Sequence, residues 1–386
     1  MNYKKVILLN GTFSGSQHEM IDSSIIIAFA MIAEKVVVYF QPRRKGIIKS
    51  LVEQRIDKKN ITYKTILNLP DSVRVTFREL IAAIQECWIF LTKADKNTLT
   101  CLTYINRFNC YGLNFLSKIT HKPLIIICHG EIRVACTQRH KDEINWVKML
   151  RRFYGQTILA KNARLVVLGE YIKHNIGQYI PKENISKLLF FDHPYFSTSE
   201  RMPHSLHTPI RIGVIGYLKR ESERGFENVK KMAIAIADND EFELRLLSSV
   251  ERELVNELPD SVRLMNPDSV FIPRNEYNKM IEELDYIYCP YPTGAFKAIA
   301  SGALLEAISK HKPIIMHKNE HAMYLRKKYG EFGIVMDDSE DAFVKIRPFL
   351  NDMEQYKHLQ LMQDSLLTKL SPENLSDQLK QICDSI

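Results

Sequence analysis

The sequence has few of the residues that mark unusual protein classes. Its 386 residues include only 15 Gly, 15 Pro and 7 Cys, which excludes collagen-like, disordered and disulfide-rich chains. The longest purely apolar run, 25–33, is far shorter than the roughly 20 residues that span a bilayer. No Cys-x-x-Cys pair occurs, so we expect reduced thiols and no structural zinc. The first ten residues hold too short an apolar stretch for a signal peptide, and we expect a cytoplasmic protein.

Charge is plentiful and unevenly distributed along the chain. The net charge is +8, yet residues 1–200 carry 29 Lys and Arg against 16 Asp and Glu, whereas residues 201–386 have a net charge of −5. This asymmetry predicts an anionic partner for the first half, although a high pI can also serve solubility alone. The cationic and aromatic stretch 144–154 suits the inner face of an anionic membrane, but its apolar residues have helical spacing and would equally pack inward. Nucleic acid is not expected, because the cations are dispersed and no binding module is present.

Short apolar, β-branched runs alternate with longer amphipathic stretches throughout the chain. This alternation predicts an α/β fold of two Rossmann-like domains, each with a parallel sheet covered by helices on both faces. A polar stretch with three prolines, 194–209, interrupts the periodicity. We therefore expect an N-terminal domain at 1–196, a linker at 197–209, a second domain at 210–350, and C-terminal helices at 351–386 that pack back on the first domain.

The apolar runs give the positions of the expected strands. In the first half they are 5–9, 35–40, 62–67, 88–91, 124–128, 165–168 and 188–191. In the second half they are 210–215, 243–247, 263–265, 286–289, 313–316 and 333–336. Three/four spacing predicts helices over 226–237 and 277–284.

Ligand sites of parallel sheets lie at the carboxyl ends of the strands. The first strand runs into a loop with Gly11 and Gly15, which is either a tight turn or a place where the backbone approaches an anion. The loop matches neither Gly-x-Gly-x-x-Gly nor a P-loop, so dinucleotide or ATP binding has little support. His129 directly follows another strand and is either a binding residue or a buried histidine with a structural role.

The second half has two loops suited to a diphosphate. Gly216 ends a strand and is followed by Lys219, Arg220 and Arg224, which either neutralise phosphate or form a solvated charged loop. A Pro-rich loop then leads into Ala300-Ser-Gly-Ala303, the predicted start of a helix. Its N–H groups suit phosphate oxygens, and Glu306 near the helix start suits ribose hydroxyls. A structural helix would equally favour an early Glu.

These motifs resemble the nucleotide-sugar domain of GT-B glycosyltransferases, closest to the retaining family 4. Gly216-Tyr-Leu218 stands where that family has Gly-Arg-Leu, and Arg224-Gly-Phe226 stands where it has Lys-Gly-Phe. The segment Glu306-Ala-Ile-Ser-Lys-His-Lys-Pro-Ile-Ile315 matches the second Glu of the family's Glu-x7-Glu block and the Glu-Ala-Met-Ala-x-Gly-x-Pro-Val-Val pattern that begins at that Glu. The chain departs from the pattern at Ala298, in place of the first Glu, and at Tyr217, in place of Arg.

The resemblance implies a function and a set of site residues. It implies a GT-B architecture facing an interdomain cleft, and transfer of a sugar from a UDP- or GDP-linked donor to a glycan or lipid-linked acceptor. Retention of configuration is implied, with no metal or other cofactor, because Lys and Arg side chains would stabilise the leaving diphosphate. The implied catalytic residues are His129, Lys219 and Arg224. The implied donor-binding residues are Gly11, Gly15, Gly216, Tyr217, Lys297, Ser301, Gly302, Ala303 and Glu306.

Three other functions are compatible with the same sequence. A GT-B nucleotide-sugar epimerase would share the donor site. The departures at Ala298 and Tyr217 would also suit a catalytically inactive relative that binds nucleotide sugars. A nicotinamide-dependent oxidoreductase would be doubly wound as well, but the missing Gly-x-Gly-x-x-Gly disfavours it.

Overall fold

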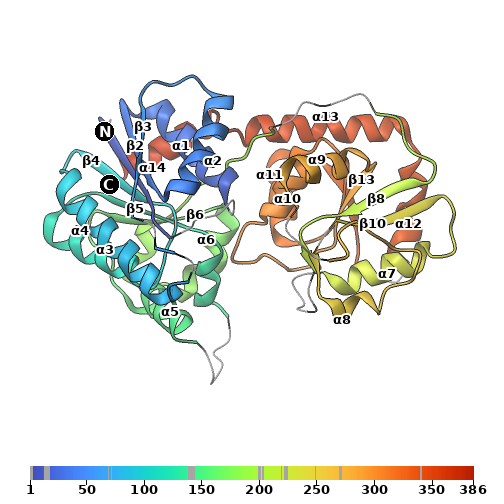
Figure 1. Cartoon of the computed structure of the whole chain (residues 1–386), viewed down its shortest axis with the longest axis horizontal. Coiled ribbons are helices and arrows are strands. Elements are labelled where there is room, and N and C mark those ends of the chain that lie inside the picture. The colour runs from blue at the N-terminus through green and yellow to red at the C-terminus, as the bar shows by residue number, and fades with distance from the viewer. Residues whose placement is uncertain are drawn as a thin grey trace. The chain divides into compact units, whose positions relative to one another are not determined.

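The computed structural model divides the chain into two compact units (Figure 1). The first comprises residues 1–196, 298–300 and 370–386, and the second comprises 197–297 and 301–369. The structure describes residues 3–12, 18–67, 69–70, 72–137, 144–198, 201, 204–218, 220, 225–247, 249–268, 272–339 and 341–386. The predicted site residues Gly15, Lys219 and Arg224 lie outside these ranges.

The first unit is built on a seven-stranded parallel sheet with the order β3-β2-β1-β4-β5-β6-β7. Its strands are β1 (Lys5–Asn10), β2 (Lys35–Phe40), β3 (Ile61–Thr65), β4 (Thr98–Leu102), β5 (Leu124–Cys128), β6 (Ala163–Val167) and β7 (Leu188–Phe190). Its helices are α1 (Glu19–Ile32), α2 (Pro42–Arg55), α3 (Val75–Lys93), α4 (Asn109–Thr120), α5 (Asn145–Gln156), α6 (Glu170–Ile176) and α14 (Ser376–Asp384). Three 3-10 helices complete it: η1 (Gly130–Ala135), η2 (Gly177–Tyr179) and η3 (Lys182–Lys187).

In the first unit, one strand prediction is wrong and one strand is not predicted. The run 88–91 was expected to be a strand but lies inside α3, and the fourth strand of the sheet is Thr98–Leu102 instead. A four-residue apolar run fits a buried strand and an apolar helix face equally well, so periodicity does not separate them. The alternating polar and apolar residues of β4 gave only a weak signal.

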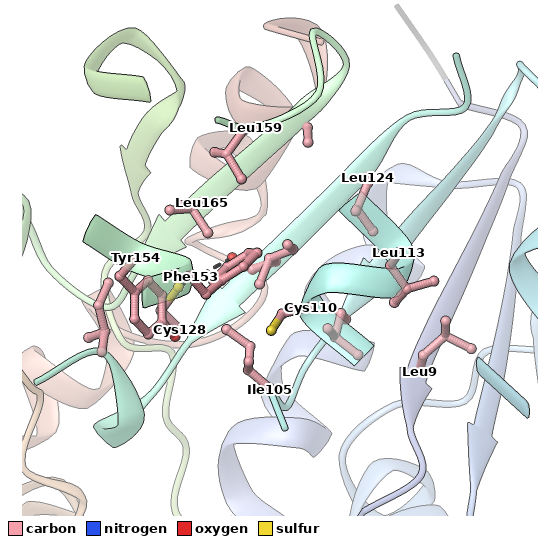
Figure 2. Packing of buried hydrophobic residues seen from close by; sticks show 14 of the residues in the cluster. Leu9, Ile105, Cys110, Leu113, Leu124, Cys128, Phe153, Tyr154, Leu159 and Leu165 are labelled. Carbon is pink, nitrogen blue, oxygen red and sulfur yellow. Dashed lines mark hydrogen bonds between the residues drawn. The ribbon is translucent and has the colours of Figure 1, made fainter. Parts of the chain in front are cut away.

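Helices α3, α4 and α5 contribute to one apolar core on one face of this sheet. Figure 2 shows Cys110 and Leu113 of α4 and Phe153 and Tyr154 of α5 within it. Phe153 and Tyr154 of α5 pack edge-to-face with ring centroids 5.5 Å apart, and Tyr111 of α4 lies 5.3 Å from the Phe153 ring. Leu150 and Phe153 are 2% and 1% exposed. The inward-packing interpretation of 144–154 therefore holds for Leu150 and Phe153, whereas Ile144 and Trp146 of the same stretch are 58% and 36% exposed.

Helices α1 and α14 pack together within the first unit. Most of α1 is buried, including the polar Asp22, Ser23 and Ser24. On α14, Leu379, Ile382 and Cys383 are buried as well. The last residues of the chain therefore complete the first unit rather than the second.

The second unit has a six-stranded parallel sheet with the order β12-β10-β8-β13-β14-β15. Its strands are β8 (Ile210–Val214), β10 (Phe242–Leu246), β12 (Arg263–Leu264), β13 (Tyr286–Cys289), β14 (Ile314–His317) and β15 (Gly333–Met336), and a separate pair is formed by β9 (Tyr217–Leu218) and β11 (Ser249–Val250). Its helices are α7 (Phe226–Ile236), α8 (Arg252–Val255), α9 (Arg274–Glu282), α10 (Gly302–Ser309), α11 (Glu320–Tyr329), α12 (Ala342–Leu350) and α13 (Met353–Lys369).

Each sheet reverses its winding at one point. In the first unit this switch point lies between β1 and β4, and in the second it lies between β8 and β13. In doubly wound sheets, ligands bind outside the carboxyl ends of the strands that flank the switch point. The topology therefore predicts ligand sites at the loops after β1 and β4 in the first unit, and at the loops after β8 and β13 in the second.

Candidate functional site

The loop after β8 lies directly against the loop after β13 and the start of α10. Gly216 has φ +98°, and a Cβ placed on it would lie 3.3 Å from the Tyr291 hydroxyl oxygen and 3.7 Å from Ala303 Cβ. The positive φ and the close neighbours both favour glycine here. Two predicted donor-binding residues, Gly216 and Ala303, are thus brought together. Tyr217, the next residue, is 41% exposed.

The loop after β13 holds strained backbone. Phe296 has φ +64°, a conformation that costs a bulky residue about 1–3 kcal/mol and persists only when its surroundings enforce it. Its ring packs edge-to-face on Tyr291 at 4.8 Å. Gly294 has φ +77°, and a Cβ there would lie 3.4 Å from Lys297 Cε. The loop therefore presents the exposed Lys297 from a tightly constrained backbone.

The start of α10 follows this loop. Ser301 caps the helix by accepting a hydrogen bond from the Leu304 N–H at 3.2 Å, and its own N–H donates to His321 Nδ1 at 2.9 Å. The N–H groups of Gly302 and Ala303 precede the first intrahelical bonds, so the helix itself supplies them no acceptor. They lie at the positive end of the helix dipole, which suits an anionic group.

Glu306 lies one turn further along α10 and is half-buried. Its Oε1 accepts a hydrogen bond from Arg274 at 2.8 Å, and Lys310 Nζ lies 4.0 Å away. Arg274 opens α9, so a residue that sequence reasoning did not single out fixes the orientation of the predicted ribose ligand.

The loop between β9 and α7 is anchored at both described ends. Gly225 has φ +74°, and a Cβ on it would come within 2.4 Å of the Pro290 carbonyl oxygen. Asn228 Nδ2 donates to that same carbonyl at 2.9 Å. Arg220 is paired with Glu257, which also accepts from Lys230 at 3.0 Å. Arg220 therefore already has an acidic partner within the unit.

A histidine and an aspartate that the sequence analysis overlooked lie at the ends of β14 and β15. His317 Nδ1 is 2.7 Å from Asp338 Oδ1, and its Nε2 is 2.7 Å from the Tyr288 hydroxyl. Burial lowers the pKa of His317, although Asp338 opposes the shift. In the sequence, the one indication of this pair is its position, because His317 and Asp338 each come at or just after the end of a predicted strand.

In the first unit, Gly11 at the end of β1 is enclosed by its neighbours. Its N–H donates to Glu86 Oε1 at 2.7 Å, and its carbonyl accepts from Gln41 Nε2 at 2.7 Å. A Cβ would lie 2.6 Å from Ile66 Cδ1. Packing thus accounts for glycine at this position, and the polar groups of its backbone are already used.

His129 follows β5 and belongs to a group of three histidines. Its ring centroid lies 5.3 Å from that of His18. Burial, reinforced by His18 and His193, lowers the pKa of His129 well below its usual value, and burial lowers that of His193 to about 4. Burial also raises the pKa of Glu131, which accepts from the His129 N–H at 3.0 Å, to about 7. These histidines are therefore neutral at neutral pH and are suited to hydrogen bonding rather than to charge stabilisation.

One residue group in the described part of the chain brings three potential metal ligands within 4.8 Å of one another: His204, His207 and Asp285. Both His204 Nε2, at 2.6 Å, and His207 Nδ1, at 2.9 Å, face the same Asp285 oxygen. The backbone N–H of Arg211 donates to the other oxygen at 2.7 Å. The carboxylate thus already links the start of the second unit to β13 through hydrogen bonds.

The sequence also contains one Asp-x-Asp triplet, Asp238-Asn-Asp240, whose carboxylates have a spacing compatible with a divalent cation. It lies in the turn between α7 and β10. This turn is at the amino ends of the strands, opposite the edge that carries Gly216 and α10. The triplet is therefore not positioned to act at the switch point.

Two parallel α/β units with these strand orders define the GT-B fold of glycosyltransferases. HepE from Anabaena, solved in complex with UDP and glucose, has a TM-score of 0.66 at 13% identity, over 99% of this chain and 100% of HepE. A glycosyltransferase from Rickettsia africae has a TM-score of 0.64 at 11% identity, over 100% of this chain and 99% of its own.

The same fold is found in other nucleotide-sugar chemistry. A Listeria monocytogenes protein named as a UDP-N-acetylglucosamine 2-epimerase has a TM-score of 0.58 at 10% identity, over 99% of this chain and 96% of its own. No protein-family model and no curated protein sequence matches the chain. At these identities the likenesses establish the fold. No helix in the described parts of the chain is long and apolar enough to cross a membrane.

Proposed function

We propose that the protein is a glycosyltransferase that takes its sugar from a UDP- or GDP-linked donor. The observation that carries the proposal is the switch point of the second sheet. There Gly216 lies against Ala303 at the open N-terminus of α10, and Glu306 follows one turn later. The N–H groups of Gly302 and Ala303 would hold the diphosphate, and the Glu306 carboxylate would accept from ribose hydroxyls.

The chemistry of the transfer follows from where charge develops. As the sugar leaves, negative charge grows on the diphosphate, and a helix N-terminus with fixed cations stabilises it. Lys297 is the described cation on the adjacent loop, and Lys219 and Arg224 keep the same proposed role. Reaction without a metal, retention of configuration and membership of family 4 are further parts of this proposal, supported by the motifs around Glu306. His129 is proposed to position the sugar through its neutral ring.

The acceptor and location are proposed from charge. Because residues 1–200 have a net charge of +13, an anionic or lipid-linked glycan acceptor at the inner face of a membrane suits the first unit.

The first test is a thermal-shift screen with UDP-, GDP-, ADP- and CMP-sugars, since a ligand that binds only the folded state raises the melting temperature. The stabilising donor is then titrated by calorimetry against Glu306→Ala. Losing a charge-assisted hydrogen bond costs about 1.5–3 kcal/mol, so affinity should fall roughly 10- to 150-fold.

The matched control is Glu241→Ala, which removes an exposed ion pair with Arg347 (2.6 Å) near the amino ends of the strands. It should bind donor like the wild type. Unchanged affinity in Glu306→Ala would refute the donor-site assignment. Incubation with donor alone distinguishes the alternatives, because an epimerase would convert it and an inactive relative would bind it without turnover even when acceptors are added.

A further inference from the structure

Helix α3 of the first unit has an outward face made of large apolar side chains. Between residues 77 and 91, the exposed residues of α3 are Phe77, Leu80, Ile84, Trp88 and Leu91, which we call the α3 stripe. Their exposed fractions run from 36% at Leu80 to 65% at Trp88. The spacing of three and four residues aligns them along one side of the helix.

The α3 stripe is not needed for the core of the unit. The opposite side of the helix already buries Ala82, Ala83, Ile89 and Phe90. The neighbouring α4, which packs against α3, also exposes Phe115 at 61% and Ile119 at 57%. Large apolar side chains exposed together along one helix face mark an interaction site.

Charge around the stripe indicates the kind of partner. Residues 74–96 and 107–122, which contain α3, α4 and their flanks, carry seven Lys and Arg against three Asp and Glu. Glu86 is buried, and Glu79 is paired with Arg107 at 2.6 Å, which leaves six Lys and Arg against one further acid. Two lysines lie at the end of α3, where Lys122 donates to the Leu91 carbonyl at 2.8 Å and Lys5 to the Lys93 carbonyl at 2.6 Å.

We propose that the α3 stripe, with Phe115 and Ile119, inserts into the headgroup region of an anionic lipid bilayer. An apolar helix face with a Trp, bordered by cations, is the pattern of interfacial membrane attachment. Each cation near an anionic surface adds to the attraction. A second copy of this chain would instead bring two cationic borders together, which disfavours self-association through this face. The proposal supplies a surface for the membrane location proposed above, and it is independent of donor chemistry.

The test uses the two tryptophans of the chain, Trp88 on the stripe and Trp146 on α5. In a Trp146→Phe background, Trp88 is the only tryptophan reporter. Vesicles with 30% phosphatidylglycerol in phosphatidylcholine should shift its emission to shorter wavelength and co-sediment with the protein. Pure phosphatidylcholine vesicles should bind at least tenfold more weakly. Raising the salt from 50 to 300 mM should weaken the anionic binding.

Replacing the stripe residues tests the surface itself. The double variant Ile84→Glu/Leu91→Glu should lose at least tenfold in vesicle affinity, with unchanged melting temperature and donor binding. The matched control, Ile234→Glu, changes an equally exposed apolar residue (60%) on α7 of the second unit and should bind vesicles like the wild type. Wild-type vesicle binding by the stripe variant would overturn the proposal. So would binding that ignores lipid charge, or dimerisation that only the stripe variant abolishes.

Discussion

Glu86 is a carboxyl group held entirely inside the first unit. Its two oxygens accept from the Gly11 N–H at 2.7 Å and from Asn109 Nδ2 at 2.9 Å. Burial nevertheless raises its pKa to about 7, because two neutral donors do not replace hydration of a charge. The folded state therefore binds this proton more tightly than the unfolded chain.

Glu86 therefore makes the first unit less stable as the pH rises. The stability that Glu86 contributes is complete below its ordinary pKa of 4.5 and is lost as the pH rises through about 7. In Glu86→Gln this dependence disappears. Between pH 5 and pH 8 the free energy of unfolding of the wild type should fall relative to the variant by roughly 2–3 kcal/mol.

Urea unfolding followed by tryptophan fluorescence measures this effect, since both tryptophans lie in the first unit. Glu53→Gln, on the exposed side of α2, is the control and should track the wild type at every pH. A constant difference between Glu86→Gln and the wild type from pH 5 to pH 8 would contradict the assignment.

Some residues of the candidate site stand out in the sequence and others do not. Gly216, Ser301 and His129 were identifiable because each follows a buried strand or precedes a helix, which is local information. Tyr291 and Arg274 were not, because their roles depend on non-local neighbours. Tyr291 meets Gly216 only because β13 lies beside β8, and Arg274 meets Glu306 only because α9 begins near α10.

At the scale of elements, the start of α7 depends on one glycine. Gly225 combines φ +74° with a Cβ position 2.4 Å from the Pro290 carbonyl oxygen. Gly225→Ala should therefore cost the second unit at least about 2 kcal/mol, since left-handed strain and a backbone clash add. The measurement is the thermal transition of the second unit by calorimetry.

Gly46 in the exposed middle of α2 provides the opposite case. A Cβ there meets nothing within 4 Å, so Gly46→Ala should stabilise the first unit by about 0.5–1 kcal/mol. Equal effects of the two substitutions would show that the backbone at Gly225 relaxes freely.

Elements were predicted best where a strand is buried on both faces. The strand at 35–40 was predicted with the bounds that β2 has, because residues 36–40 form a continuous apolar run and are all buried. The strand prediction at 88–91 failed because Trp88 and Leu91 belong to the exposed α3 stripe while Ile89 and Phe90 are buried, so the helix has apolar residues on both sides. Apolar composition alone does not distinguish a core from a binding surface.

At the scale of the whole molecule, the first unit is completed by the distant segment 370–386. The Asp192 N–H donates to Gln378 at 3.0 Å, and Arg55 pairs with Glu373 at 2.9 Å. Leu379 is fully buried in α14. Leu379→Ala should therefore destabilise the first unit by about 2–5 kcal/mol, detected by tryptophan fluorescence in urea.

The neighbouring Lys380→Ala, at an exposed position, serves as the control and should leave that transition unchanged. The calorimetric transition of the second unit should not respond to either substitution. If Leu379→Ala shifted the second transition and left the first in place, α14 would be assigned to the wrong unit.

The order of these segments along the chain also determines which unit can be completed first during translation. Residues 1–196 leave the ribosome well before α14, and at about 5–20 residues per second the delay is roughly 10–40 s. Synthesis of the second unit is complete at residue 369, before residues 370–386 of the first unit have been made. The growing chain then displays the part of α1 that α14 later covers. Transiently exposed apolar surface of this kind is prone to aggregation, and this exposure ends once α14 has been synthesised.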